Sequence, residues 1–189
     1  MRQREVAKIG LSRIRSSETH LARRASRHEG ILTLDERLLA YLHCYNIRRD
    51  YFLCHEYGES LWLDSGRPEA LKGLIQAAVC LYHLENGNVR GAYPMWLRAK
   101  AYMQSIRPVY EQIDIESLLR DTQRVFDHLP RDLFERVVPE QRIALLQLPI
   151  VTLRILDSDL AEQVKTMTLP PLHGDEAEGG DRDDAHHLT

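Results

Sequence analysis

The sequence lacks most of the signals that assign a chain to a well-known class of protein. Only three of its 189 residues are cysteines, and they form no C-x-x-C pair. This odd, small number argues against a disulfide framework and favours a reducing compartment. No apolar run approaches the length of a membrane span, and no signal-peptide core follows the basic start. The sequence therefore predicts a cytoplasmic protein without a transmembrane segment.

Nucleotide-binding and hydrolase fingerprints are also missing. The chain has no P-loop, no dinucleotide-binding glycine pattern and no serine-hydrolase elbow. It has little net charge as well, since the total is −3, but the distribution is uneven. Residues 1–28 carry +6, residues 175–189 carry −5, and the centre is mildly acidic. We therefore expect no nucleic-acid binding by the core.

What the chain does have is the composition of one globular domain with tails. Hydrophobic residues make up 43% of it and charged residues 28%. Residues 1–32 are predicted to be a flexible basic extension, with a basic helix on a membrane or nucleic acid as the alternative. Residues 168–189 are predicted to be a disordered acidic tail. Between them, residues 33–167 should form a single all-α domain, an up-and-down helical bundle of about five to six helices.

Capping and turn residues divide this domain into helices. Thr33 and Glu36 have the spacing of a capping box, Asp50 and Asn88 can cap later helices, and Gly87 can supply a left-handed stop. The expected elements are helices at residues 33–46, 50–64, 68–86, 88–106 and 114–129, a possible extended segment over the bundle at 148–155, and a short last helix at 157–166.

Polar side chains interrupt the apolar pattern of the second and third of these helices. His55 and Glu59 are four residues apart and share a face, with Trp62 three residues further along. On the next helix, Gln76 and His83 share a face. Consecutive helices with short connections pack as antiparallel neighbours, so the two faces can meet with Trp62 as an apolar wall.

Three kinds of function remain open for this polar face. The first is a non-catalytic module, in which the face is either a buried polar network that fixes helix register or a site for a small ligand. The second is a metal-assisted hydrolase with His55, Glu59 and His83 as ligands of a divalent metal and Glu56 as base. The third is an assembly or interaction protein. The candidate ligand-binding residues are His55, Glu56, Glu59, Trp62, Gln76, His83 and Asn88.

The sequence leaves the activity, the cofactor and the partner of the protein open. The sequence favours a non-catalytic role over an enzyme, assigns no catalytic residue and implies no cofactor strongly, although a divalent metal is possible. His55 and Glu56 begin an H-E-x-x-H pattern, but Glu59 stands where the second zinc histidine would be, which argues against a zinc protease. The partner could be an unknown small molecule or protein, and a homo-oligomer is possible.

Three consecutive blocks of residues also carry a family resemblance. They read Asp50-Tyr-Phe-x-x-His55-Glu56-x-x-Glu59-x-x-Trp62, Gly73-Leu-Ile-Gln76-x-Ala78-x-x-x-Tyr82-His83 and Gly87-Asn88-x-x-Gly91-Ala92. In type and spacing they resemble domain-of-unknown-function family 309, which comprises small bacterial and archaeal helical proteins. The resemblance implies an all-α, up-and-down bundle and brings no established activity. One departure is Gly58, where the family usually has an apolar residue and where glycine costs about 1 kcal/mol of helix stability relative to alanine.

Overall fold

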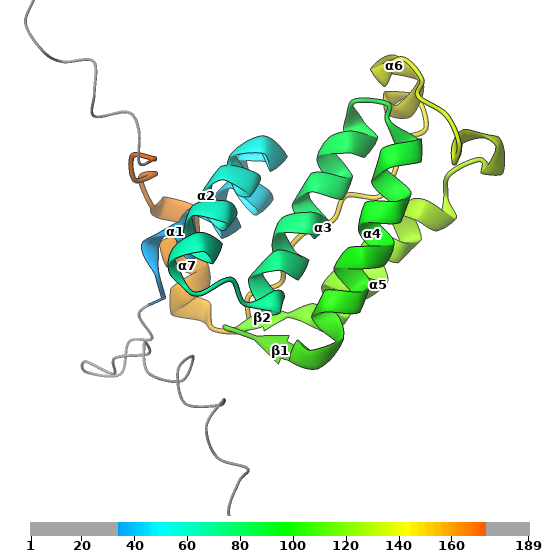
Figure 1. Cartoon of the computed structure of the whole chain (residues 1–189). Helices are drawn as coiled ribbons and strands as arrows, with labels where there is room; N and C mark the ends of the chain where they lie inside the picture. The colour runs from blue at the N-terminus through cyan, green and yellow to red at the C-terminus, as the bar shows by residue number, and fades with distance from the viewer. Residues whose placement is uncertain (1–33, 173–189) are drawn as a thin grey trace, which may run out of the picture. The chain divides into compact units, whose positions relative to one another are not determined.

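The computed structural model describes residues 34–172, which are mainly helical, so the predicted all-α bundle is confirmed (Figure 1). The predicted basic extension, the Thr33 cap and the acidic tail from residue 173 onward lie outside the described residues. The elements are α1 (Glu36–His43), α2 (Tyr51–Asp64), α3 (Glu69–Glu85), α4 (Val89–Met103), β1 (Val109–Tyr110), β2 (Ile113–Asp114), α5 (Ile115–Asp127), α6 (Glu140–Ala144) and α7 (Ser158–Thr166).

Side-chain caps fix where the helices begin. Asp50 and Asn88 cap α2 and α4 as predicted, each accepting a hydrogen bond from the amide three residues later, at 3.0 and 2.9 Å. The cap of α1 is Asp35, which accepts from the amide two residues later at 3.0 Å, so this helix begins later than the predicted position 33. Gly87 has a φ of 76° and ends α3, as expected for a left-handed stop.

Helix α3 is the central element, with α2 on one side and α4 on the other (Figure 1). Most of its apolar side chains are buried. Gly73 permits the contact with α4, because a Cβ atom there would lie 2.7 Å from Cγ of Met103. Beyond α4, the fully buried Trp96 stacks on Phe126 of α5, with ring centroids 6.2 Å apart. Each such large apolar side chain contributes about 1.5–3 kcal/mol by leaving water.

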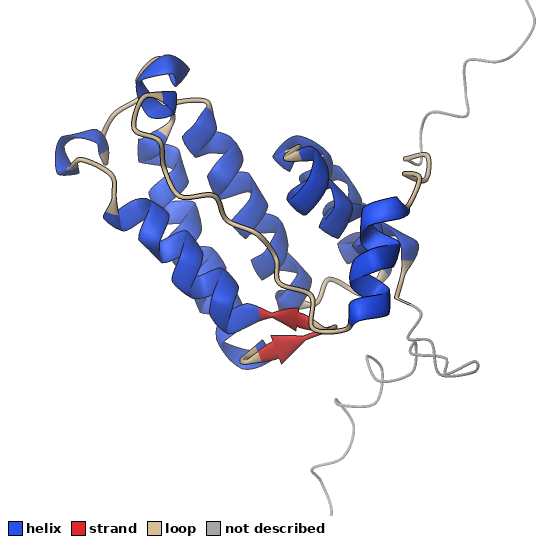
Figure 2. Cartoon of the chain, turned by 180° about the vertical axis from the view of Figure 1, so that it is seen from behind, coloured by secondary structure: helices blue, strands red, loops and turns tan. Residues whose placement is uncertain are grey.

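Residues 147–156, which we call the strap, run from α6 to the β1–β2 hairpin (Figure 2) and are extended after the left-handed residue Gln147. The side-chain amide of Asn46 holds the strap by donating to the carbonyl of Leu153 and accepting from its amide, both at 2.8 Å. Val151 and Leu153 point inward and are 1% and 2% exposed. The extended conformation predicted for residues 148–155 is therefore confirmed, as is the last helix, which Asp157 caps.

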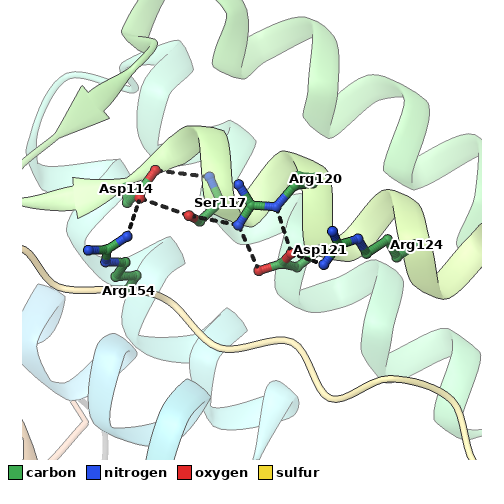
Figure 3. A network of polar contacts seen from close by, with 6 residues as sticks. All are labelled: Asp114, Ser117, Arg120, Asp121, Arg124 and Arg154. Atoms are coloured by element: carbon green, nitrogen blue, oxygen red, sulfur yellow. Dashed lines mark hydrogen bonds and ion pairs between the residues drawn. The ribbon is translucent and has the colours of Figure 1, made fainter.

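A polar network ties the end of the strap to the start of α5 (Figure 3). Asp114 accepts from the amide and the hydroxyl of Ser117, at 2.9 and 2.8 Å, and lies 3.7 Å from the guanidinium of Arg154. The hydrogen bonds from Ser117 hold the pKa of the Asp114 carboxyl below its usual value. Arg120 extends the network by donating to Ser117 and to Asp121. Its outer members are exposed and add little stability.

Several local features were not predicted from the sequence. They are the β1–β2 hairpin, the short helix α6, and a π-helical turn (Cys44–Arg48) that continues α1 before the left-handed residue Arg49. The fourth helix also ends earlier than expected, at Met103, and a 3₁₀ turn (Gln104–Ile106) follows it. Within residues 34–172 no helix combines the length and the apolar character needed to cross a bilayer.

Candidate functional site

A cavity of about 270 Å³ lies between α2 and α3, with α4 at its edge. Its polar lining comes from His55, Glu59 and Trp62 of α2 and from Lys72 and Gln76 of α3. Ile75, Val79 and Met95 supply the apolar lining. The structure therefore brings together four of the seven candidate residues from the sequence, namely His55, Glu59, Trp62 and Gln76.

The two helices build this cavity through their periodicity. On α2 the lining residues are spaced by four and three positions, and on α3 they recur three, four and seven positions after Lys72, so each set occupies one helix face. A four-residue connection, 65–68, makes the helices antiparallel neighbours. Lys72 and Val79 were missed as lining residues, although this spacing relative to Gln76 would have identified them.

Gly58 explains how closely the helices approach beside the cavity. It is buried on α2, and a Cβ atom there would lie 2.7 Å from Cγ1 of Ile75 and 3.4 Å from the ring of Tyr41. A larger residue would force Ile75, itself part of the cavity wall, to move. The departure from the family pattern at Gly58 thus coincides with a close helix–helix contact.

The other three candidate residues lie outside the cavity lining. His83 stands seven residues beyond Gln76, or about 10 Å along the helix axis. There its Nδ1 atom is 3.3 Å from the side-chain amide of Asn88. Glu56 lies beside the cavity and contacts His55, with Oε1 3.0 Å from Nδ1.

The predicted metal ligands are consequently not assembled. His55 and Glu59 are neighbours, with Nε2 and Oε2 3.6 Å apart, but His83 is held at the far end of α3. Among residues 34–172, no group of three or more His, Cys, Asp or Glu side chains is placed to hold a metal ion. The sequence does not predict this separation of His83 from His55 and Glu59. Residues on one helix face can lie on different turns, and the sequence does not state which turn meets the neighbouring helix.

Two buried polar atoms at the cavity have no hydrogen-bond partner in the described part of the chain. They are the indole Nε1 of Trp62, a donor, and the amide Oε1 of Gln76, an acceptor. Leaving a buried polar group unsatisfied costs about 1–3 kcal/mol. No hydrogen bond between described residues joins the His55–Glu59 pair to Gln76, so the predicted register-fixing network is not formed. The residues that line the cavity therefore include one donor and one acceptor that the described protein groups do not satisfy.

Two cationic side chains beside the cavity contact aromatic rings. Lys72 has its ammonium nitrogen 4.8 Å from the centroid of the Tyr102 ring, and the guanidinium carbon of Arg67 lies 5.4 Å from the Trp62 ring centroid. These cation–π contacts orient both groups. His55 and Glu59 lie at the rim, with side chains 35% and 48% exposed. The cavity therefore combines a solvent-accessible charged rim with a deeper donor and acceptor.

The helices that form this cavity lie in a segment that is similar to a known protein family. Residues 38–95 match the family model described as Domain of unknown function (DUF309). Residues 38–95 are thus similar to this family of unknown function. The match confirms the resemblance inferred from the three sequence blocks, and every residue that lines the α2–α3 cavity falls within the DUF309 segment.

A curated relative supports the same assignment. The chain is 31% identical over 94 residues to the uncharacterized protein YpuF of Bacillus subtilis (strain 168), an alignment that covers 47% of this chain and 54% of YpuF. The chain thus spans about half the length of that relative. No solved structure matches the chain. The similarity to DUF309 brings no activity with it, so function has to be argued from the cavity itself.

Proposed function

We propose that the cavity between α2 and α3 binds a small polar ligand, and that this binding, without catalysis, is the function of this helical domain. The observation that supports it most is that two residues lining this cavity, Trp62 and Gln76, each carry a buried polar atom with no hydrogen-bond partner in the described part of the chain, Nε1 and Oε1 respectively. Folded proteins rarely leave such atoms unsatisfied unless something else occupies the space.

The two atoms also indicate the chemistry of the ligand. Trp62 needs an acceptor and Gln76 needs a donor, so the ligand should carry both, as an amide, a lactam or a pyrimidine base does. Ile75, Val79 and Met95 offer an apolar surface to the rest of the molecule. A volume of about 270 Å³ lies just below the usual range for drug-sized ligands, which favours a compact one.

The rim residues would complete recognition. His55 can donate or accept, and Glu59 can accept, so they can hold a polar substituent at the opening. The hydrolase alternative has no comparable support, because His83 lies apart from His55 and Glu59. A cytoplasmic location is part of the same proposal and agrees with the three cysteines, all of which are buried and free.

Thermal unfolding with defined probes tests the proposal. We expect at least one of uracil, 2-pyrrolidinone and nicotinamide to raise the melting temperature saturably. A ligand at a hundred times its dissociation constant adds about 2.7 kcal/mol, which corresponds to several degrees for a domain of this size. Native mass spectrometry of untagged protein would provide the stoichiometry and reveal any ligand retained through purification.

The variant Gln76→Leu separates binding from folding. It removes the unsatisfied acceptor, so the ligand-free protein should be as stable as wild type or more stable by about 1 kcal/mol. The ligand-induced shift should disappear. Gln163→Leu makes the same change on the exposed surface of α7 and should keep the full shift. Binding that survives Gln76→Leu unchanged, or no saturable shift with any probe, would overturn the proposal.

A further inference from the structure

A second cavity, of about 250 Å³, lies against the opposite face of α3. The α3 residues that line it are Leu81, Leu84 and Glu85, which are turned about half a revolution away from the Gln76 face. Its other walls come from the start of α2, from α5 and α6, and from the strap, which passes over this side of the helices in Figure 2. Neither the sequence pattern nor the proposed function accounts for it.

Arg49 brings a positive charge to this cavity and is held in a defined position. Its backbone is left-handed, with a φ of 57°, and its Nη1 atom donates to the carbonyl of Val151 in the strap at 2.8 Å. The guanidinium carbon lies 5.6 Å from the centroid of the Tyr51 ring. Arginine has five N–H donors, and the remaining ones have no hydrogen-bond partner in the described part of the protein.

Glu85 brings a negative charge to the same cavity. Its carboxylate makes no hydrogen bond or ion pair with a residue in the range 34–172, so it does not touch Arg49. Glu85 is exposed on the helix surface, but partial burial of its carboxyl raises its pKa, and the nearby Arg49 opposes part of that rise. The Tyr51 hydroxyl also lacks a hydrogen-bond partner among the described residues. The cavity therefore holds two opposite charges that are close enough to interact and yet are not paired with each other.

The apolar walls restrict what could bridge these charges. Leu81, Val125 and Ile143 all line the cavity. An anion alone would be repelled by Glu85, and a cation alone by Arg49. A zwitterion with a short hydrocarbon side chain satisfies both charges and covers the apolar wall, and the small volume fits a ligand of that size.

We propose that this cavity binds an aliphatic α-amino acid, with its carboxylate on Arg49, its ammonium group on Glu85 and its side chain against Leu81, Val125 and Ile143. The site is separate from the α2–α3 cavity, so the proposal does not depend on the function proposed above. Tyr51 also lines this cavity.

Isothermal titration of the full chain with L-leucine tests the site. We expect saturable binding of one molecule per chain. The analogues 4-methylpentanoate, which lacks the ammonium group, and 3-methylbutylamine, which lacks the carboxylate, should each bind more weakly by about tenfold or more, because each leaves one of the two charges of the cavity unpaired. Leucine that fails to saturate, or analogues that bind as well as leucine, would overturn the proposal.

Charge-neutralising variants locate the binding. Glu85→Gln should weaken leucine binding by about tenfold or more while leaving 4-methylpentanoate no weaker than in wild type. Glu69→Gln makes the same change at the start of α3, away from the cavity, and should leave the leucine affinity unchanged. Gln76→Leu should also bind leucine normally, which distinguishes this site from the other cavity. Normal leucine binding by a Glu85→Gln protein with wild-type circular dichroism would contradict the assignment.

Discussion

The two cavities on either side of α3 are similar in volume but are built in different ways. The α2–α3 cavity draws all its lining residues from positions 55–95, inside the DUF309 segment and mainly from two consecutive helices. The second cavity, which we call the strap cavity, combines residues from position 49 with residues up to position 151. One depends on local helix pairing, and the other depends on the return of a distant segment. The two should therefore respond differently to substitutions that displace that segment.

The largest effect is expected from Gly87→Ala. The left-handed φ of 76° strains any residue with a side chain, and the new Cβ atom would clash with the carbonyl oxygen of Val138. That contact anchors the chain just before α6, because the amide of Val138 donates to the carbonyl of Gly87 at 2.9 Å. Strain of about 1–2 kcal/mol plus the clash should cost about 3 kcal/mol or more, measured by urea unfolding.

Gly87→Ala should also affect ligand binding at the two cavities differently. Hydrogen exchange should accelerate in α6, leucine binding at the strap cavity should weaken, and probe binding at the α2–α3 cavity should persist. Gly66→Ala is the matched control, since Gly66 has a φ of 82° but nothing lies within 4 Å of its Cβ position. It should cost only about 1 kcal/mol. Equal losses in the two variants would show that the contact with Val138 is unimportant.

An intermediate effect is expected on the other side of α3, from Gly58→Ala. Alanine gains about 1 kcal/mol of helix propensity, but its Cβ atom would lie 2.7 Å from Cγ1 of Ile75, and overpacking costs about 1–3 kcal/mol. We therefore expect a net loss of up to about 2 kcal/mol in urea unfolding, with weaker probe binding at the α2–α3 cavity and normal leucine binding at the strap cavity.

A double-mutant cycle identifies the cause of that loss. In an Ile75→Ala background the obstructing atom is gone, so Gly58→Ala should cost less than it does in wild type, and the coupling should exceed about 0.5 kcal/mol. A Gly58→Ala protein that is more stable than wild type would mean that α2 can move away from α3 at no cost.

Sequence reasoning succeeded where structure is set by short-range chemistry. The starts of α2 and α4 follow from the side-chain oxygens of Asp50 and Asn88, and the end of α3 follows from Gly87. Helix periodicity likewise placed His55, Glu59, Trp62 and Gln76 on faces that do line one cavity. All of these inferences use contacts within about one helical turn or between consecutive helices.

The failures involve residues whose partners are distant or lie on another turn. His83 shares the face of Gln76, but a helix face extends over many turns, and the sequence does not state which turn meets α2. The strap cavity was missed because Arg49 and Glu85 acquire their setting only when Val151 is brought back from a hundred residues away. Helix α6, with five residues, is too short to show a periodic pattern.

The smallest expected effect is on the pH dependence of stability and comes from Glu85 at the strap cavity. Because burial raises the pKa of Glu85 above its value in the unfolded chain, its contribution to stability is present when the carboxyl is protonated and is lost as pH rises through the folded-state pKa. Glu85→Gln mimics the protonated form. We therefore expect the variant and wild type to melt alike below the unfolded pKa of about 4.5, with the variant melting slightly higher at pH 7.

Two further measurements test the direction of this pH dependence of stability. Asp114 has a lowered pKa because Ser117 donates hydrogen bonds to it, so Asp114→Asn should show the opposite behaviour, a loss at pH 7 that fades as the carboxyl of the wild type becomes protonated. With saturating leucine, the advantage of Glu85→Gln at pH 7 should reverse, because the ammonium group then pairs with the wild-type carboxylate. If Glu85→Gln still melts higher than wild type at pH 7 in saturating leucine, Glu85 does not contact the ligand. The strap cavity would then not bind a ligand through a pair of opposite charges, the feature that distinguishes it from the α2–α3 cavity.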